Sequence, residues 1–437
     1  MPWQDGLHDM KANIIHGDFN PRGGAERLSL VTMKALLEMG VDFDLTTLKT
    51  PNITKLENTY GKNLVSVLED VKQINIINIL EELARQQQEN DEDYNYNITI
   101  NTNGDAAPYY QRSFSKQTAI TYCHFPSTKY HIESRNIEYL KTDLGMTAEE
   151  DANVFLDNDN NNNNHEDIVA YNLQEYQTRL QFSNEVRRKR TKQECFELIE
   201  YGYLNLMRNS TVVTNSEFSR RAIANAFGLE NTHVLSPPID IETFQNVALI
   251  ANGRNERSHT VVVISRIAPH KQIENAIKLA KILKDKKIGN KIKIVGNLYE
   301  YFFDYYSELK QMVVDLGLAD CIQFEINASL DTLIHIIRES RVYFHPMIGD
   351  HFGMAVVEAM AAGLIPVVPN KGGPSEFVPQ RYQFANLEQA AEIIAHVLND
   401  FSKTEQIKIR DETGKFSNSH YIDGFQRLIN ELIFKRA

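Results

Sequence analysis

Two carboxylates, Asp350 and Glu358, stand eight positions apart around a turn that contains Phe352 and Gly353. Residues 341–346 just before them form a short apolar run that ends at a proline, which predicts a buried strand. Residues 356–362 after them have the small and apolar spacing of a helix packed on a sheet. The acids therefore bracket a strand-to-helix loop, where open α/β sheets bind ligands. They can bind the hydroxyls of a sugar or a ribose, and the alternative is a helix N-cap acid followed by a buried helix acid.

Two cations and a second glycine loop belong to the same half of the chain. Arg266 directly follows the apolar run 260–265, and Lys271 comes five residues later on the same loop. Arginine offers a fork of donors and lysine a mobile point charge, a pair that suits a diphosphate, although either could be a solvated surface cation. Gly372 and Gly373 follow the last predicted strand and open a predicted helix, so their amides form a candidate anion cradle.

The first half of the chain contributes a third glycine pair and a histidine. Gly23 and Gly24 lie between a predicted strand at residues 12–20 and a helix, which makes an anion or polar-ligand cradle or simply a tight turn. They are not the dinucleotide fingerprint, because Gly-x-Gly-x-x-Gly is absent. His124 stands immediately after the predicted strand 118–123, at a carboxyl end where a functional histidine and a structural one are both reasonable.

The elements that position these residues alternate between strand and helix, which predicts mostly parallel sheets covered by helices on both faces. The pattern runs once through the first half and restarts at residue 260 with near-continuous β-branched residues. We therefore expect a first domain over residues 1–235, a second over 236–418 and a C-terminal amphipathic helix over 419–437. The strands expected in the first domain are residues 12–20, 42–48, 98–102, 118–123 and 211–214.

Two polar segments look inserted into the first domain, near residues 86–96 and 157–167. The second contains five consecutive asparagines and is predicted to be a disordered loop. It superficially suggests a calcium-binding EF-hand, but Asn162 stands where glycine is required and Ile168 where glutamate is required. We therefore expect no metal there.

Composition sets the broad class. The 437 residues suffice for two or three domains, and the formal net charge of -12 argues against a nucleic-acid binder, whose footprint is basic. Cys123, Cys195 and Cys321 are far apart without metal spacing, which favours a reducing compartment. We see no signal peptide and no apolar run near the ~18 residues that a membrane span needs. A cytoplasmic protein is expected.

Taken together, these motifs resemble family 4 of the retaining glycosyltransferases over nearly the whole chain. The resemblance is strongest around Arg266 and Lys271, around residues 350–363, and at Gly372 and Gly373. It implies the GT-B fold, two facing Rossmann-like domains with mostly parallel sheets and a last helix that crosses back to the first domain. It implies a nucleotide-sugar donor on the second domain, an acceptor against the first, and reaction in the cleft.

The resemblance also assigns roles to residues. It places the donor diphosphate on Arg266, Lys271 and the glycine-loop amides, including those of Gly23 and Gly24, with the loop residues Phe352, Gly353 and Met354 nearby. Glu358 would take the ribose and Asp350 the hexose, with Asp350 standing where the family usually has glutamate. His124 would contact the donor sugar near the reacting centre. No cofactor or metal is expected, because the cations and amides would stabilise the leaving diphosphate.

Within that family, the order Gly-Gly-x-Glu-Arg at residues 23–27 and the segment 122–126 look most similar to eukaryotic α-1,2-mannosyltransferases that extend dolichol-linked glycans on the cytosolic face. Mannose from GDP-mannose and a saccharide or polyprenyl-linked acceptor are the favoured substrates. The basic run at residues 187–192, before a helix rich in large apolar residues, suggests an anionic membrane surface as partner. A core helix with a solvated basic start is the alternative.

Two other functions remain open from the sequence. A GT-B nucleotide-sugar epimerase shares the architecture and would convert the donor without an acceptor. A non-catalytic nucleotide-sugar-binding protein would bind the donor without turnover, a reading that the Asp350 substitution leaves open and the intact cation pair opposes.

Overall fold

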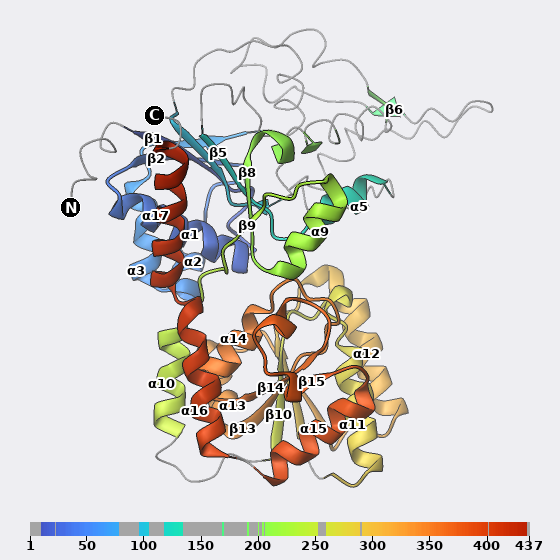
Figure 1. Cartoon of the computed structure of the whole chain (residues 1–437). Coiled ribbons are helices and arrows are strands. Elements are labelled where there is room, and N and C mark those ends of the chain that lie inside the picture. Colours follow the sequence, from blue (N-terminus) through green and yellow to red (C-terminus); the bar gives the residue numbers. More distant parts are fainter. Residues whose placement is uncertain are drawn as a thin grey trace, which may run out of the picture. The chain divides into compact units, whose positions relative to one another are not determined.

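A computed structural model of the chain describes residues 10–21, 23–77, 96–104, 118–133, 168–169, 190–191, 200, 203–204, 206–251, 259–288, 291–400 and 402–434. The chain folds into two compact units. Unit 1 comprises Met1–Asn215, Ser219–Leu235 and Ile422–Ala437. Unit 2 comprises Ser216–Phe218 and Ser236–Tyr421. Figure 1 colours both along the chain.

Unit 1 is built on a seven-stranded sheet in the order β3-β2-β1-β4-β5-β8-β9, with every neighbouring pair parallel. The strands are β3 Ile74–Ile76, β2 Asp42–Thr47, β1 Lys11–Ile15, β4 Ile98–Asn101, β5 Thr118–Tyr122, β8 Thr211–Thr214 and β9 His233–Val234. The central strands are buried over nearly their whole length, as a parallel sheet covered on both faces requires. A separate antiparallel pair joins β6 Ile168–Val169 to β7 Arg190–Thr191.

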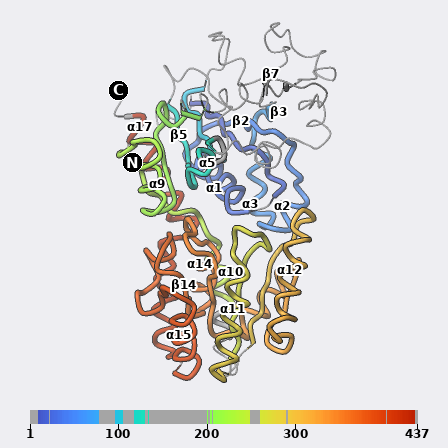
Figure 2. Tube along the Cα trace, turned by 90° about the vertical axis from the view of Figure 1, so that its right-hand side faces the viewer, coloured from blue at the N-terminus to red at the C-terminus, as the bar shows by residue number. Residues whose placement is uncertain are grey.

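The helices of unit 1 include the last one of the chain. They are α1 Gly24–Glu38, α2 Ile53–Tyr60, α3 Lys62–Val65, the 3₁₀ turn η1 Ser66–Asp70, α5 Ser127–Glu133, α9 Glu217–Phe227 and α17 Asn418–Phe434. Helix α3 packs on α1 (Figure 2). Helix α17 belongs to unit 1 from Ile422 onward and lies beside α1, where Gln426 Nε2 donates to the carbonyl of Ala35 at 3.2 Å (Figure 1). The predicted return of the C-terminal helix to the first domain is confirmed.

Unit 2 has a six-stranded parallel sheet in the order β12-β11-β10-β13-β14-β15. Its strands are β12 Ile322–Ile326, β11 Lys291–Gly296, β10 Thr260–Ile264, β13 Ser340–Phe344, β14 Ile365–Pro369 and β15 Gln383–Phe384. Helix α10 packs with α13 and α14, and α14 with α16, whereas α11 packs with α12 and α15 (Figure 1). These helices are α10 Ile241–Ala251, α11 Glu274–Asp285, α12 Phe303–Asp315, α13 Leu330–Glu339, α14 Met354–Ala361, α15 Leu387–Asn399 and α16 Lys403–Asp411.

Local sequence explains where these elements begin. Strand β10 reads Thr-Val-Val-Val-Ile and its first four residues are buried, which suits a strand covered on both faces. The side chains of Ser329, Asn386 and Ser402 accept backbone hydrogen bonds in the first turns of α13, α15 and α16, the usual N-cap interaction. Gly353 is the N-cap of α14 and has a φ of +83°, a conformation that favours glycine.

Each sheet has one point at which the strand order reverses, and the candidate residues lie after strands at this point or, for His124, Gly372 and Gly373, one strand further along. In unit 1, β1 lies between β2 and β4, and in unit 2, β10 lies between β11 and β13. Ligands of open parallel sheets bind outside the carboxyl ends of the strands at such points. The relevant loops are therefore those after β1 and β4 in unit 1 and those after β10 and β13 in unit 2.

Two expectations need correction and others lie outside the described residues. Tyr96 is not part of a polar insert: it is buried, and its hydroxyl donates to Asp44 Oδ2 at 2.6 Å. Gly372 and Gly373 open only the short 3₁₀ turn η6 Gly373–Glu376, because Pro374 and a tight loop follow β14. The remainder of the first insert, residues 86–95, the asparagine-rich segment 157–167 and the basic residues 187–189 and 192 lie outside the described part of the chain.

Candidate active site

Asp350 is the centre of the polar contacts in unit 2. It follows β13, is 8% exposed, and its Oδ2 lies 3.3 Å from Lys271 Nζ. Its Oδ1 accepts the amide of Phe352 at 3.2 Å. Burial alone would raise the pKa of Asp350, but the charge of Lys271 and the contact with His345 outweigh burial and hold this pKa well below its usual range. The structure thus joins two residues that the sequence placed on separate loops.

The same carboxylate contacts a histidine that the sequence analysis did not select. His345 is 5% exposed, and its Nε2 lies 3.3 Å from Asp350 Oδ2 without the alignment of a regular hydrogen bond. Its Nδ1 is 3.0 Å from the hydroxyl of Tyr343. Burial, with the charges of Asp350 and Glu358, raises the pKa of Tyr343 well above its usual value, so the phenol keeps its proton. Its acceptors are Nδ1 of His345 and the carbonyl oxygen of Ile264 at 3.5 Å.

A signal for His345 was present in the sequence. It lies near the carboxyl end of the predicted strand 341–346, and a position after a strand's carboxyl end had singled out His124. Its role depends on a partner five residues away, and the spacing alone does not show that the two side chains meet.

The glycines of the second loop are required for close packing. A Cβ at Gly373 would lie 2.2 Å from the carbonyl oxygen of His351, and one at Gly372 would lie 2.7 Å from that of Asp350. The amide of Gly373 already donates to the Asp350 carbonyl at 2.7 Å. This amide therefore holds two loops together, and a phosphate cradle here would have to use other amides.

The two cations differ in their surroundings. Lys271 is half-buried beside Asp350, whereas Arg266 is exposed, and the structure shows no direct contact between them. Both act on His270, since partial burial together with the charges of Lys271 and Arg266 lowers the pKa of His270 to about 4. The loop after β10 thus carries a positive field that favours an anion.

The remaining predicted residues of unit 2 surround the start of α14. Phe352 is buried, with its ring 5.4 Å from Phe377 and 5.5 Å from Phe416. Met354 is the first residue of α14 and is half-buried. Glu358 lies one turn further along α14, is also half-buried, and contributes to the shifted pKa of Tyr343. The two carboxylates predicted from spacing therefore act on one buried phenol.

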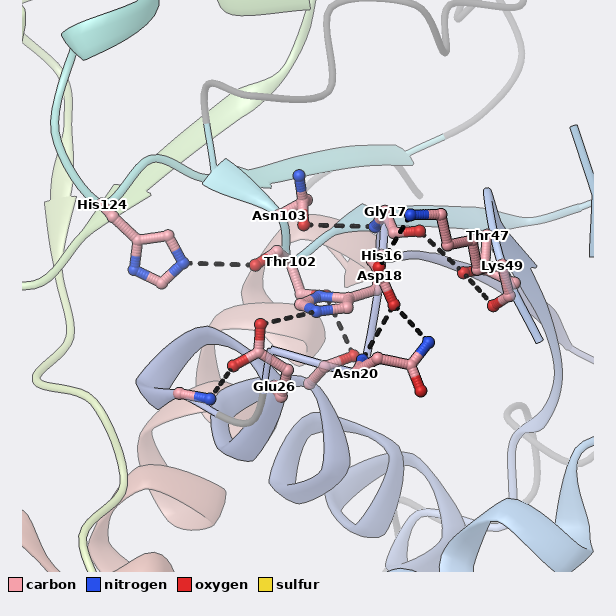
Figure 3. Close-up of polar contacts among 12 residues, drawn as sticks. His16, Gly17, Asp18, Asn20, Glu26, Thr47, Lys49, Thr102, Asn103 and His124 are labelled. Carbon is pink, nitrogen blue, oxygen red and sulfur yellow. Dashed lines mark hydrogen bonds and ion pairs between the residues drawn. The ribbon is translucent and has the colours of Figure 1, made fainter. Parts of the chain in front are cut away.

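In unit 1 the structure places His124 near the loop after β4 (Figure 3). Its Nε2 lies 3.3 Å from the carbonyl of Thr102, which can only accept, so the proton is on Nε2 and the lone pair on Nδ1. Burial lowers the pKa of His124 to about 4, the bond to Thr102 opposing this shift. At neutral pH the ring is uncharged, and Nδ1 can accept from a hydroxyl.

The loop at Gly23 and Gly24 differs from the expected cradle. Gly23 is the N-cap of α1 and Gly24 its first residue. The Gly23 amide donates to the carboxylate of Glu26 and its carbonyl accepts from the hydroxyl of Tyr60 at 2.7 Å. Glu26, known from the sequence only as part of a motif, thus occupies an amide that was expected to face a ligand.

The described residues include neither a metal-binding cluster nor a membrane-spanning helix. Within those ranges, no three His, Cys, Asp or Glu side chains are grouped so as to hold a metal ion. In the same part of the chain, no helix has the length and apolar character that would carry it across a membrane.

The fold and the site together define the class. Residues 247–414, which lie within unit 2 and include its whole site, match the family model Glycosyl transferases group 1. This segment is therefore similar to the glycosyltransferase group 1 family, and the architecture of the chain is shared with solved glycosyltransferases. The Anabaena protein HepE, solved with UDP, has a TM-score of 0.60 at 17% identity over 98% of this chain and all of that one. Sucrose-phosphate synthase from Thermosynechococcus elongatus has a TM-score of 0.64 at 13% identity over the same shares.

The curated proteins similar to this chain have names that specify a donor, an acceptor and a linkage. The GDP-Man:Man(3)GlcNAc(2)-PP-Dol alpha-1,2-mannosyltransferase of Dictyostelium discoideum is 28% identical over 214 residues, 46% of this chain and 42% of that protein. Its Homo sapiens counterpart is 28% identical over 229 residues, 49% of this chain and 46% of that protein. The matched segments thus span less than half the length of either relative.

Proposed function

We propose that this protein is a retaining mannosyltransferase that moves mannose from GDP-mannose to a glycan acceptor. One observation carries the proposal: at the strand-order reversal of the matched domain, Lys271, Asp350 and the Gly372–Gly373 loop converge in a field that favours an anion. The relatives named for transfer from GDP-mannose support the choice of donor. The nucleotide sugar would bind unit 2 and the acceptor unit 1.

The chemistry follows from the leaving group. Transfer breaks the bond between the sugar and the diphosphate, and negative charge develops on the diphosphate. Lys271 and Arg266 would stabilise that charge, and we propose that no metal ion is required. Asp350 neutralises Lys271 while the donor is absent, so the donor diphosphate competes with this carboxylate for the ammonium group. Glu358 would accept from the ribose, and His124 Nδ1 would accept from a hydroxyl of the sugar.

We also propose a class of acceptor and a membrane surface as partners. A saccharide on a polyprenyl diphosphate is the acceptor that the relatives' name suggests. We propose that the reaction takes place on the cytoplasmic face of a membrane, where the basic run at residues 187–192 would meet anionic lipid. Co-sedimentation with vesicles containing phosphatidylserine tests this. Binding that falls with salt and is lost when Arg187, Arg188, Lys189 and Arg190 become Ser supports it, whereas no binding at low salt excludes surface attachment.

The main test is product analysis. The protein is incubated with GDP-mannose and a short mannose-containing acceptor, and the products are examined by mass spectrometry and by the anomeric configuration of the new bond. Transfer with an α-linkage supports the proposal. A changed sugar on the donor in the absence of acceptor would instead indicate an epimerase, and tight GDP-mannose binding without any product would indicate a binding protein.

A further inference from the structure

A connected series of buried polar groups in unit 1 joins Glu26, His16 and Thr102 (Figure 3). Glu26 is 7% exposed; one carboxylate oxygen accepts from the Gly23 amide, and the other lies 3.7 Å from His16 Nε2. His16 is fully buried, with Nδ1 3.2 Å from the hydroxyl of Thr102. The carbonyl of Thr102 accepts from His124. Gly23 and His124, predicted from separate motifs, are therefore linked through three buried side chains.

The hydrogen-bond pattern assigns the proton on one side of the His16 ring. The hydroxyl of Thr102 donates to the carbonyl of Ile15 at 3.1 Å or to Ser29 Oγ at 3.0 Å. Its lone pair is then left to accept from His16 Nδ1–H. Nε2 makes no regular hydrogen bond within the described residues and faces the carboxylate of Glu26.

A helix cap alone does not explain this arrangement. Glutamate at the third position of a helix commonly accepts the N-cap amide, and an exposed side chain is sufficient for that. Here the carboxylate is buried, which carries a cost unless an opposite charge compensates it. Burial alone would raise the pKa of Glu26, but the contact with His16 outweighs burial and lowers this pKa. Phe19 packs on the imidazole at 4.3 Å between ring centres and fixes its orientation.

We propose that Glu26 and His16 are positioning residues. As a buried contact pair they hold the Gly23–Gly24 loop at the start of α1 and, through Thr102, the ring of His124 with its Nδ1 available to a sugar hydroxyl. This inference rests on the proposed transferase function. Neither side chain touches the substrate. Together they keep the Gly23–Gly24 loop and the ring of His124 in one geometry.

The test combines a structural readout with a kinetic one. Glu26→Gln keeps an acceptor for the Gly23 amide but removes the charge, and Glu26→Ala removes both. His16→Gln removes the partner imidazole. Glu38→Gln, the same change at the exposed last residue of α1, is the matched control. Hydrogen-exchange mass spectrometry follows peptides within residues 17–27, and steady-state kinetics follow mannose transfer from GDP-mannose.

We expect exchange in these peptides to be fastest in Glu26→Ala and intermediate in Glu26→Gln and His16→Gln. Glu38→Gln should match the wild type. Because small misplacements at a reacting centre reduce turnover strongly, kcat should fall about 10- to 100-fold in Glu26→Gln while the Kd for GDP, which binds unit 2, changes less than about twofold. Should Glu26→Ala fail to fold, the Gln variants carry the comparison.

Wild-type exchange rates in both Glu26→Gln and His16→Gln would overturn the pairing. Faster exchange with unchanged kcat would reduce Glu26 to a helix cap. If the wild type transfers no mannose, the proposed function fails, and the exchange data still decide whether the pair holds the loop.

Discussion

The ion pair between Lys271 and Asp350 gives the sharpest test of the proposed donor site. Replacing Lys271 by Met keeps most of the apolar stem and removes the charge. At 3.3 Å and an effective dielectric constant of 20, the pair attracts by about 5 kcal/mol before desolvation is subtracted. Asp350 retains its contacts with His345 and the amide of Phe352. We therefore expect Lys271→Met to lower the free energy of unfolding by only about 1–3 kcal/mol.

The double variant Lys271→Met/Asp350→Asn separates stability from binding. Without either charge no unpaired charge remains buried, so its stability should recover at least part of what Lys271→Met loses, a coupling that urea unfolding of all four proteins measures. Affinity for GDP should not return, because the diphosphate still lacks its ammonium partner. Calorimetry should show a 10- to 100-fold weaker Kd in both Lys271→Met proteins. Lys278→Met, at an exposed site on α11, is the control.

The ion pair also predicts an acid dependence. The folded-state pKa of Asp350 is lowered, so its contribution to stability is complete above the unfolded value near 4 and is lost as pH falls through the folded one. Lys271→Met should flatten this acid limb. Recovery of GDP affinity in the double variant, or wild-type affinity in Lys271→Met, would refute the assignment of Lys271 to the diphosphate.

Three further predictions concern separate parts of the site. Gly373→Ala should lower the free energy of unfolding by about 1–3 kcal/mol, because its Cβ meets backbone at 2.2 Å, whereas Gly414→Ala, with nothing within 4 Å, should be neutral in the same urea titration. Glu358→Ala should weaken GDP binding about tenfold or more by calorimetry, through loss of an acceptor for the ribose; unchanged affinity would remove that role. His124 has a folded pKa of about 4 against 6.5 unfolded. The free energy of unfolding of the wild type should therefore fall by up to about 1 kcal/mol per pH unit between pH 6 and 4, relative to His124→Asn. Parallel pH profiles of the two proteins would contradict a buried neutral ring.

Most strands and helices could be predicted because their apolar patterns are long and regular. Strand β10 reads as consecutive β-branched residues, and the structure buries it as such. Strands β3 and β9 were missed because they are short and their ends are exposed, so neither pattern nor burial distinguishes them from loops. Their place in the sheet depends on backbone pairing with β2 and β8, which the chain acquires only on folding.

The sequence could predict which loops carry the candidate residues, but not which side chains meet there. Strand ends located Asp350 and His124, but the direction of each side chain depends on partners from other loops.

The two units repeat one arrangement of a histidine, a carboxylate and a glycine amide. In each, a buried histidine after a central strand faces a carboxylate with Nε2, as His345 faces Asp350 and His16 faces Glu26. The acidic residue also accepts a hydrogen bond from a glycine amide. In unit 2 the acceptor is the backbone carbonyl of Asp350, and in unit 1 it is the side chain of Glu26. Sequence spacing identifies the glycines as a cradle, whereas the contacts show that part of each cradle is used to hold the loop itself. A glycine loop next to a buried acid should therefore be tested for internal hydrogen bonds before its amides are assigned to a phosphate.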